Sequence, residues 1–384
     1  LLNSLMYVIV EEKLCDEKYI TEHTTDFEKL KANVADYSPE KVAPICGIPE
    51  ETLREVARTF ATAESAIILW GMGISQHIHG TDNSRCLISL SLMTGQIGRP
   101  GTGLHPLRGQ NNVQGTSDMG LIPMFFPDYK SVTDPENKKW FENFWGTSLN
   151  PKTGLTVVEI VDAVHSGGVR GMYVQGENPA MSDPNLNHAR GALSMLEHLV
   201  VQDIFLTETA GFADVIFPAS AFPEKSGTFT NSNRQVQLGR QAIDPPGNAR
   251  QDWWIIQEVA QRLGVDWCYD GPEKIFSEIR KATPSMAGIT WKRLQKEHSV
   301  TYPCNKEGDP GEAIVFRKGF PTANKKARFV PAKYTHADEM PDKEFPFVCN
   351  VGLAEEVNVC APDSVEDDEA LHCWSPFKFR ISFA

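Results

Sequence analysis

The first 95 residues follow a pattern of helices, then a strand, then a further helix. Residues 1–60 are expected to be mainly helical, and over residues 50–63 the apolar positions recur at helical spacing. The unbroken apolar run 66–70 predicts a strand buried on both faces. A glycine turn follows, and a helix is expected over residues 83–93. This order is that of a nucleotide-binding α/β unit, which a Gly-x-Gly pair alone does not establish.

The same alternation returns in the middle of the chain. Helices are expected over residues 156–165, 188–196 and 252–263, and strands over residues 171–174, 198–201 and 213–218. Helices and strands in this order predict an α/β fold of mostly parallel sheets with flanking helices. In such sheets, ligands bind beyond the carboxyl ends of the strands.

Polar residues stand at two of these strand ends. Residues 176–178 follow the strand expected at 171–174, and Gln202 and Asp203 follow the strand expected at 198–201. Asn and Asp at such positions either contact a ligand or cap a turn. The pattern alone leaves both interpretations open.

Residues 98–120 have almost no apolar periodicity and are rich in Gly, Asn and Gln. A structureless loop of this length is uncommon in a compact domain unless it is functional or disordered. The scarcity of Glu, Lys and Ser, and the apolar segments on either side, favour a functional loop.

The length of 384 residues exceeds what a single core of ordinary size holds. We expect an α/β domain over residues 1–110, a second α/β domain over 111–265, and a connecting segment over 266–340 that is rich in Pro, Lys and Gly. The apolar run 345–348 is expected to be the first strand of a further domain, over residues 341–384.

Charge and cysteine spacing exclude several classes of protein. The formal net charge of -13 argues against a nucleic-acid binder, which needs a basic face for phosphates. None of the eight cysteines forms a Cys-x-x-Cys pair, so we expect no iron–sulfur or zinc site in this segment and free thiols in a reducing, cytoplasmic compartment. His77 and His79 form a His-x-His pair, but two ligands are too few for a metal site.

The beginning of the chain reads as the interior of a longer protein. Leu1 is not an initiator methionine, and the apolar stretch 1–10 is too short to span a membrane. We therefore expect a segment of a longer chain, with no membrane insertion of its own.

Residues 107–115 read Leu-Arg-Gly-Gln-Asn-Asn-Val-Gln-Gly, and this run resembles the formate dehydrogenase branch of the molybdopterin oxidoreductases. The resemblance covers roughly residues 1–350. Residues 70–77 and 252–254 resemble the soluble, NAD-linked members best. Further stretches that resemble the family in the same order are 92–95, 118–120, 126–127, 175–179, 201–203, 217–219, 224–231 and 234–237.

The resemblance implies a cofactor of two molybdopterin guanine dinucleotides around one Mo or W atom. It implies that Met72 and Gln76 contact one dinucleotide. The other positions that match dinucleotide contacts of the family are Asn178, Gln202, Asp203, Lys225 and Asp252. Their chemistry agrees, since a carboxylate accepts from the amino and imino groups of guanine, amides serve its carbonyl edge, and a lysine suits pyrophosphate.

Arg108 matches the family's substrate arginine beside the metal, and Gln110 matches a polar residue of the same pocket. Formate is a small carboxylate, and a guanidinium offers it two parallel donors. The alternative for Arg108 is a surface salt bridge, which its place in a loop rich in glycine and asparagine disfavours.

By resemblance, the reaction is oxidation of formate to carbon dioxide. The family's iron–sulfur cysteines, its metal-ligating Cys or selenocysteine and the adjacent His lie upstream of this segment, so no metal ligand is expected here. Electrons are expected to leave through iron–sulfur clusters to flavin- and NAD-binding partner subunits.

The tail departs from the family pattern. Residues 350–364 are acidic where the family continues Asn-Thr-Gly-Arg, and the match partly recovers over residues 370–372 and 374–376. Either a reading-frame disturbance or a genuine divergence accounts for this segment.

There are two rival interpretations, one an enzyme of the same superfamily and the other a protein of another class. An assimilatory nitrate reductase shares Asn178, Asp203 and Lys225 but lacks the run at 107–115. The other rival is a cofactor-free structural homologue, such as the large iron–sulfur subunit of respiratory complex I. In such a protein we expect other residues at positions 108, 225 and 252, but this chain has Arg108, Lys225 and Asp252.

Overall fold

The computed structural model describes residues 1–183, 185–337 and 340–344. The chain divides into two units, one formed by Leu1–Gln110 with the residues after Glu312, and one formed by Asn111–Glu312. The strand expected at 345–348 and the divergent tail lie outside the described residues, and the domain boundaries expected from the sequence stay predictions.

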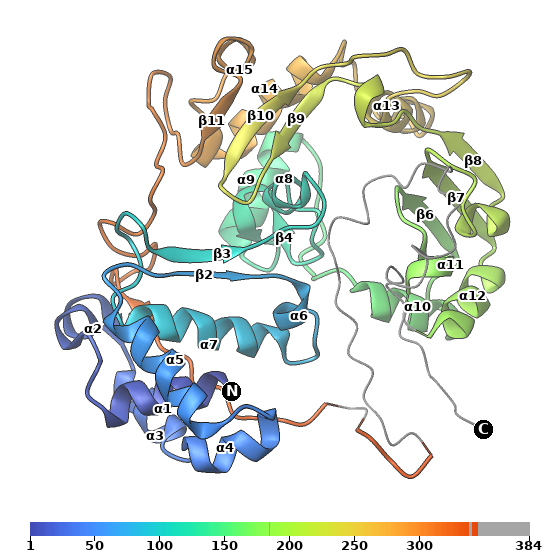
Figure 1. Ribbon diagram of the computed structural model, residues 1–384. Helices are drawn as coiled ribbons and strands as arrows, with labels where there is room; N and C mark the ends of the chain where they lie inside the picture. Colours follow the sequence, from blue (N-terminus) through green and yellow to red (C-terminus); the bar gives the residue numbers. More distant parts are fainter. Residues whose placement is uncertain (184, 338–339, 345–384) are drawn as a thin grey trace. The chain divides into compact units, whose positions relative to one another are not determined.

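The first unit is a group of helices (Figure 1) with two small parallel sheets of two strands each. In α1, Met6, Val8 and Ile9 are fully buried and belong to one core shared with α5 and α7. The elements of this unit are α1 (Leu2–Glu11), α2 (Glu17–His23), β1 (Thr24–Thr25), α3 (Phe27–Val34), α4 (Pro39–Cys46), α5 (Glu50–Thr62), β2 (Ile67–Trp70), α6 (Met72–Ser75), α7 (Gly80–Met93), β3 (Gly103–Pro106) and β12 (Ala327–Arg328).

Helix α5 and strand β2 confirm the helix expected at 50–63 and the strand expected at 66–70. The expectation that this strand is buried on both faces is wrong, because Ile67 and Leu69 are 47% and 61% exposed. Ile68 and Trp70 pack on the core instead. The strand thus has one covered face, and its unbroken apolar run reflects strand propensity as much as burial.

The segment 98–120 is more regular than its composition indicates. Strand β3 lies parallel to β2, with Ile67 opposite Gly103 and Trp70 opposite Pro106. Helix α8 (Val113–Asp118) follows in the second unit. The expectation of a structureless loop is therefore corrected: strand pairing uses backbone groups and needs no apolar pattern.

The second unit contains two three-stranded sheets (Figure 1). Its first half comprises α8, β4 (Phe125–Phe126), η1 (Pro127–Tyr129), β5 (Lys130–Ser131), α9 (Pro135–Trp145), α10 (Val157–His165), β6 (Gly171–Gln175), α11 (Pro179–Ser182), α12 (Leu186–Met195) and β7 (His198–Asp203). Its second half comprises η2 (Thr209–Phe212), β8 (Val215–Pro218), η3 (Phe222–Glu224), β9 (Gly227–Thr230), β10 (Gln235–Gly239), α13 (Asp252–Arg262), α14 (Pro272–Ala282), η4 (Pro284–Met286), α15 (Trp291–Glu297) and β11 (Ser299–Thr301).

Strands β6, β7 and β8 form a parallel sheet in that order, as the alternating pattern predicts. Val174, Leu199 and Val201 bury one face against Leu193 of α12. Tyr173 lies opposite Val200 and Gln175 opposite Gln202, so these side chains share the other face. The first residue of α13, Asp252, contacts Gln202 on that second face.

The second sheet is antiparallel, in the order β11, β10, β9. Helices α14 and α15 pack with it, inside the stretch that the sequence indicates to be a connection. The periodicity is weak there because α14 buries only Phe276 and Ala282, and α15 only Leu294. In the described part of the chain, no helix combines the length and the apolar character needed to cross a membrane.

Candidate functional site

The first group of predicted site residues lies at the carboxyl edge of the β2–β3 pair. The backbone N–H of Leu107 donates to Trp70 O at 2.7 Å, so both strands end together. Met72 begins α6 directly after β2, and Arg108 comes two residues after β3. The strand pairing therefore brings the loops that carry Met72 and Arg108 to one edge of one sheet.

The backbone at this edge is open to a ligand. A Cβ added at Gly73 or at Gly109 would meet no atom within 4 Å. Gln76 caps α6, with its backbone N–H donating to Met72 O at 2.7 Å, and its side chain is exposed. Gln110 is also exposed, whereas Arg108 is half-buried. Small residues and outward-facing amides leave room for a flat polar ligand to approach the main chain.

The second group lies at the carboxyl edge of the β6–β7–β8 sheet, where three side chains form a hydrogen-bonded chain. Gln202 Nε2 donates to Asp252 Oδ1 at 2.8 Å. Lys225 Nζ donates to the other carboxylate oxygen of Asp252, and also to Ser220 O at 3.0 Å. Gln202 is fully buried, while the side chains of Lys225 and Asp252 are both 27% exposed.

Asp252 occupies the first turn of α13, where the unpaired backbone N–H groups favour negative charge. A carboxylate has about four acceptor sites, and Gln202 and Lys225 use two of them. The remaining sites of Asp252 can accept from a ligand that presents N–H donors side by side.

Asn178 follows β6 at the same edge and ties two loops together. Its Oδ1 accepts from the Thr209 backbone N–H at 3.1 Å and from Thr209 Oγ1 at 2.7 Å, and its Nδ2 donates to Glu208 Oε2 at 2.7 Å. Gly176 just before it has a positive φ of 60° and open space beside it. Asn178 therefore acts first as a brace for the loops around the open backbone.

Asp203 lies next to Gln202 in sequence but takes no part in its hydrogen-bonded chain. Its Oδ1 accepts from the backbone N–H of Ile204 at 2.6 Å, and it lies opposite Pro218 in β8. Neighbouring residues in a strand point to opposite faces of the sheet. Asp203, the last residue of β7, thus presents its carboxylate on the face opposite to that of Gln202, apart from Asp252.

Sequence reasoning did not select Tyr173, whose hydroxyl donates to Gln202 Oε1 at 2.5 Å. A tyrosine in a strand is ordinary, so its type gives no signal. The only hint is its position two residues before Gln175, on the face that also carries Gln202.

The Asn178 brace makes a testable electrostatic prediction. Its hydrogen bond holds the pKa of the Glu208 carboxyl below the ordinary value. Asn178→Ala should raise that pKa towards the ordinary value of a glutamate, as a carboxyl-carbon NMR titration of Glu208 would measure. The Asn178–Glu208 hydrogen bond therefore adds to the free energy of unfolding at pH values above the pKa that Glu208 has in the unfolded chain. This contribution is lost as the pH falls through the lower pKa that Glu208 has in the folded protein. If the pKa of Glu208 is the same in Asn178→Ala as in the wild type, Asn178 does not hold Glu208 through this hydrogen bond.

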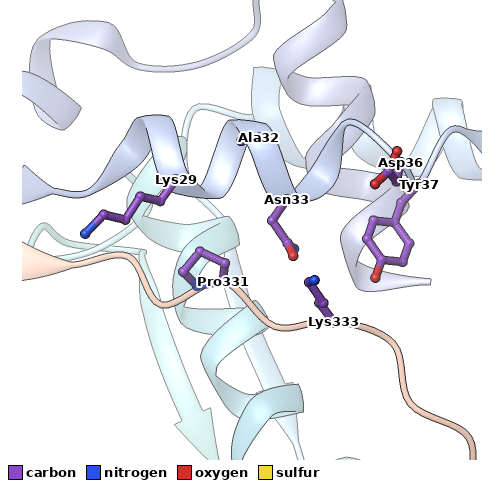
Figure 2. A pocket seen from close by; sticks show the side chains of 7 residues that line it. All are labelled: Lys29, Ala32, Asn33, Asp36, Tyr37, Pro331 and Lys333. Carbon is purple, nitrogen blue, oxygen red and sulfur yellow. The ribbon is translucent and has the colours of Figure 1, made fainter.

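A separate hollow in the first unit holds none of the predicted residues. It has a volume of about 460 Å³ and lies between α3 and the segment of Pro331 and Lys333 (Figure 2). Lys29 is ion-paired with Asp26 at 2.6 Å, and Asn33 Nδ2 donates to Ala332 O at 3.0 Å. These side chains serve the fold, so we assign no ligand to this hollow.

Comparison with known proteins gives one family. Residues 1–262 match the family model described as molybdopterin oxidoreductase. The chain is 46% identical over 355 residues to the "F420-dependent formate dehydrogenase subunit alpha" of Methanocaldococcus jannaschii, covering 92% of this chain and 52% of that protein. It is 38% identical over 351 residues to "Formate dehydrogenase H" of Escherichia coli, covering 91% of this chain and 49% of that protein.

The fold matches a solved structure at lower identity. The acetylene hydratase from Pelobacter acetylenicus superposes with a TM-score of 0.62 at 20% identity, over 85% of this chain and 47% of that one. At this identity the likeness concerns the fold alone, and it agrees with the α/β architecture of mostly parallel sheets. The chain spans about half the length of the curated relatives it matches.

Proposed function

Because this chain belongs to the molybdopterin oxidoreductase family, we propose that it is the cofactor-holding part of a formate dehydrogenase catalytic subunit, which oxidises formate to carbon dioxide. Two relatives named as formate dehydrogenases share 46% and 38% of its residues over nine-tenths of its length or more. The observation that carries the proposal is the position of Arg108, directly beyond the β2–β3 strand ends and beside the open backbone at Gly109.

The residues present fit a bis-molybdopterin guanine dinucleotide cofactor with Mo or W. The β2–β3 pair and the β6–β7–β8 sheet each end in an open edge that carries a glycine. Met72 and Gln76 lie at one edge, and Asn178, Gln202, Asp203, Lys225 and Asp252 lie at the other. We assign one dinucleotide to each edge, because guanine needs acceptors such as Asp252 and pyrophosphate needs cations such as Lys225.

When bound, the cofactor supplies a metal centre that accepts the electrons of formate oxidation. The part of Arg108 is to bind and orient the substrate. Its guanidinium offers a carboxylate two parallel N–H donors and remains charged at any working pH. Gln110, two residues on, adds an amide that can hold a substrate oxygen. Iron–sulfur clusters are assigned to other parts of the enzyme.

For the electron acceptor, we infer NAD, reached through iron–sulfur and flavin-binding partner subunits in the cytoplasm. The residues at 70–77 and 252–254 support this choice. The M. jannaschii relative is named F420-dependent, so coenzyme F420 is the second candidate. Assays of the complete enzyme with formate and either acceptor decide between them.

The proposed reaction is tested on the complete enzyme, purified under reducing conditions, with a viologen dye as artificial acceptor. We expect formate-dependent dye reduction and stoichiometric Mo or W by elemental analysis. Enzyme that contains metal but reduces nitrate and leaves formate unchanged would show that the reductase alternative is right. Complete enzyme that lacks both metal and pterin would show that the chain is a structural homologue.

A further inference from the structure

Tyr173 in β6 makes a hydrogen bond that orients the side-chain amide of Gln202. It lies opposite Val200 in β7, on the face of the sheet that carries Gln202, and its hydroxyl donates to Gln202 Oε1 at 2.5 Å. The chain of contacts then runs through Gln202 Nε2 to Asp252, and from Asp252 to Lys225. Tyr173 is therefore the outermost member of a continuous polar chain, with 41% of its surface exposed.

The charges in this chain fix the direction of every hydrogen bond. A lysine ammonium only donates, and an ionised carboxylate only accepts. The amide of Gln202 must therefore turn its NH₂ group towards Asp252, which leaves its oxygen facing Tyr173. An amide oxygen only accepts, so the Tyr173 hydroxyl is the donor.

Burial makes this arrangement costly to change. Gln202 is fully buried, so an amide oxygen without a donor would lie unsatisfied inside the protein. A rotated amide would also place its oxygen against the Asp252 carboxylate. Burial, and then the charge of Asp252, raise the pKa of Tyr173, which keeps its proton on the hydroxyl.

Resting on the proposed function, we propose that Tyr173 is a positioning residue that makes the second edge selective for a guanine nucleotide. Its hydroxyl fixes the Gln202 amide, and the fixed amide positions the Asp252 carboxylate, whose ionised oxygens only accept. Guanine presents an imino and an amino N–H side by side, which matches two carboxylate acceptors. Cytosine presents an amino group beside a ring acceptor, which a carboxylate cannot serve. Without the hydroxyl, the buried Gln202 oxygen loses its donor, the amide is held from the Asp252 side alone, and Asp252 is positioned less firmly for the paired N–H groups of guanine.

The test is Tyr173→Phe in the full-length enzyme, produced in cells that cannot make the cofactor. GMP and CMP are the probes, and calorimetry measures both affinities. One neutral hydrogen bond contributes about 0.5–1.5 kcal/mol, so the preference for GMP over CMP should fall about twofold to tenfold. Tyr269→Phe is the matched control, since its hydroxyl donates to Glu278 Oε2 at 2.6 Å, away from this edge. Its preference should equal that of the wild type.

A double-mutant cycle separates positioning from a general structural effect. In a Gln202→Leu background, Tyr173→Phe should change the preference no further, because the group through which it acts is gone. An unchanged preference in Tyr173→Phe, or an equal loss of both nucleotides, overturns the inference while formate oxidation stands. A wild-type chain that binds neither nucleotide overturns the cofactor assignment and this inference with it.

Discussion

Arg108→Lys should lower kcat/KM for formate by about one to two powers of ten while Mo or W content stays normal. Lysine keeps the positive charge but loses the planar pair of donors that a carboxylate accepts. Loss of one charge-assisted hydrogen bond costs about 1.5–3 kcal/mol, and each 1.4 kcal/mol is a factor of ten in the rate constant. Steady-state kinetics at several formate concentrations, normalised to bound metal, give the value.

Arg85→Lys is the control for the chemistry of the substitution. Arg85 lies in α7 of the same unit and pairs with Asp82 at 2.8 Å, and it is far in sequence from the 107–115 run. Its replacement should leave the kinetics unchanged, since an exposed pair of this kind contributes little. Wild-type formate kinetics in a metal-replete Arg108→Lys enzyme would remove Arg108 from the substrate site.

Much of the fold of the second unit follows from the sequence. The strands expected at 171–174, 198–201 and 213–218 are β6, β7 and β8, because buried parallel strands show as short apolar runs between turns. Helices α10 and α13 begin within one residue of the expected positions. Helix α14 could not be predicted in this way, because it buries only Phe276 and Ala282, and of these two only Phe276 packs with the antiparallel sheet.

The position of β3 depends on pairing rather than on pattern. Gly103 and Pro106 have no strand preference, and only the neighbouring β2 makes an extended strand of them. That tertiary effect is what turns the segment before Arg108 from an apparent loop into a fixed edge. A pattern read from one segment cannot supply this information, since the partner lies more than thirty residues earlier.

The candidate site is predicted in part by residue type and in part only by register. Gln202, Lys225 and Asp252 are chosen from the sequence by resemblance, and the structure adds that they form one hydrogen-bonded chain. Tyr173 joins that chain because β6 and β7 pair with Gln175 opposite Gln202. A shift of one residue would turn Tyr173 to the opposite face. Cofactor contact by these residues stays a prediction.

Lys225→Ala should reduce cofactor loading about tenfold or more, with near-normal turnover per bound metal. The ammonium is a cation of this edge, and its loss leaves the partly buried Asp252 with the Gln202 hydrogen bond but without its counter-charge, and removes the cation proposed for the pyrophosphate. A hydrogen bond to a charged group contributes about 1.5–3 kcal/mol. Metal and released GMP, both measured per enzyme, report the loading.

Lys138→Ala separates this effect from the loss of any half-buried ion pair. Lys138 pairs with Glu142 in α9 with side chains 23% and 26% exposed, close to the 27% of both Lys225 and Asp252. Both variants lose one such pair, but only Lys225→Ala loses it at the strand edge where Gln202 and Asp252 meet. Equal loading in the two variants would make Lys225 a stabilising residue of the fold. Depleted metal and GMP in Lys225→Ala alone would support a role in cofactor binding, because the two proteins differ in where the charge is removed and not in how much is buried.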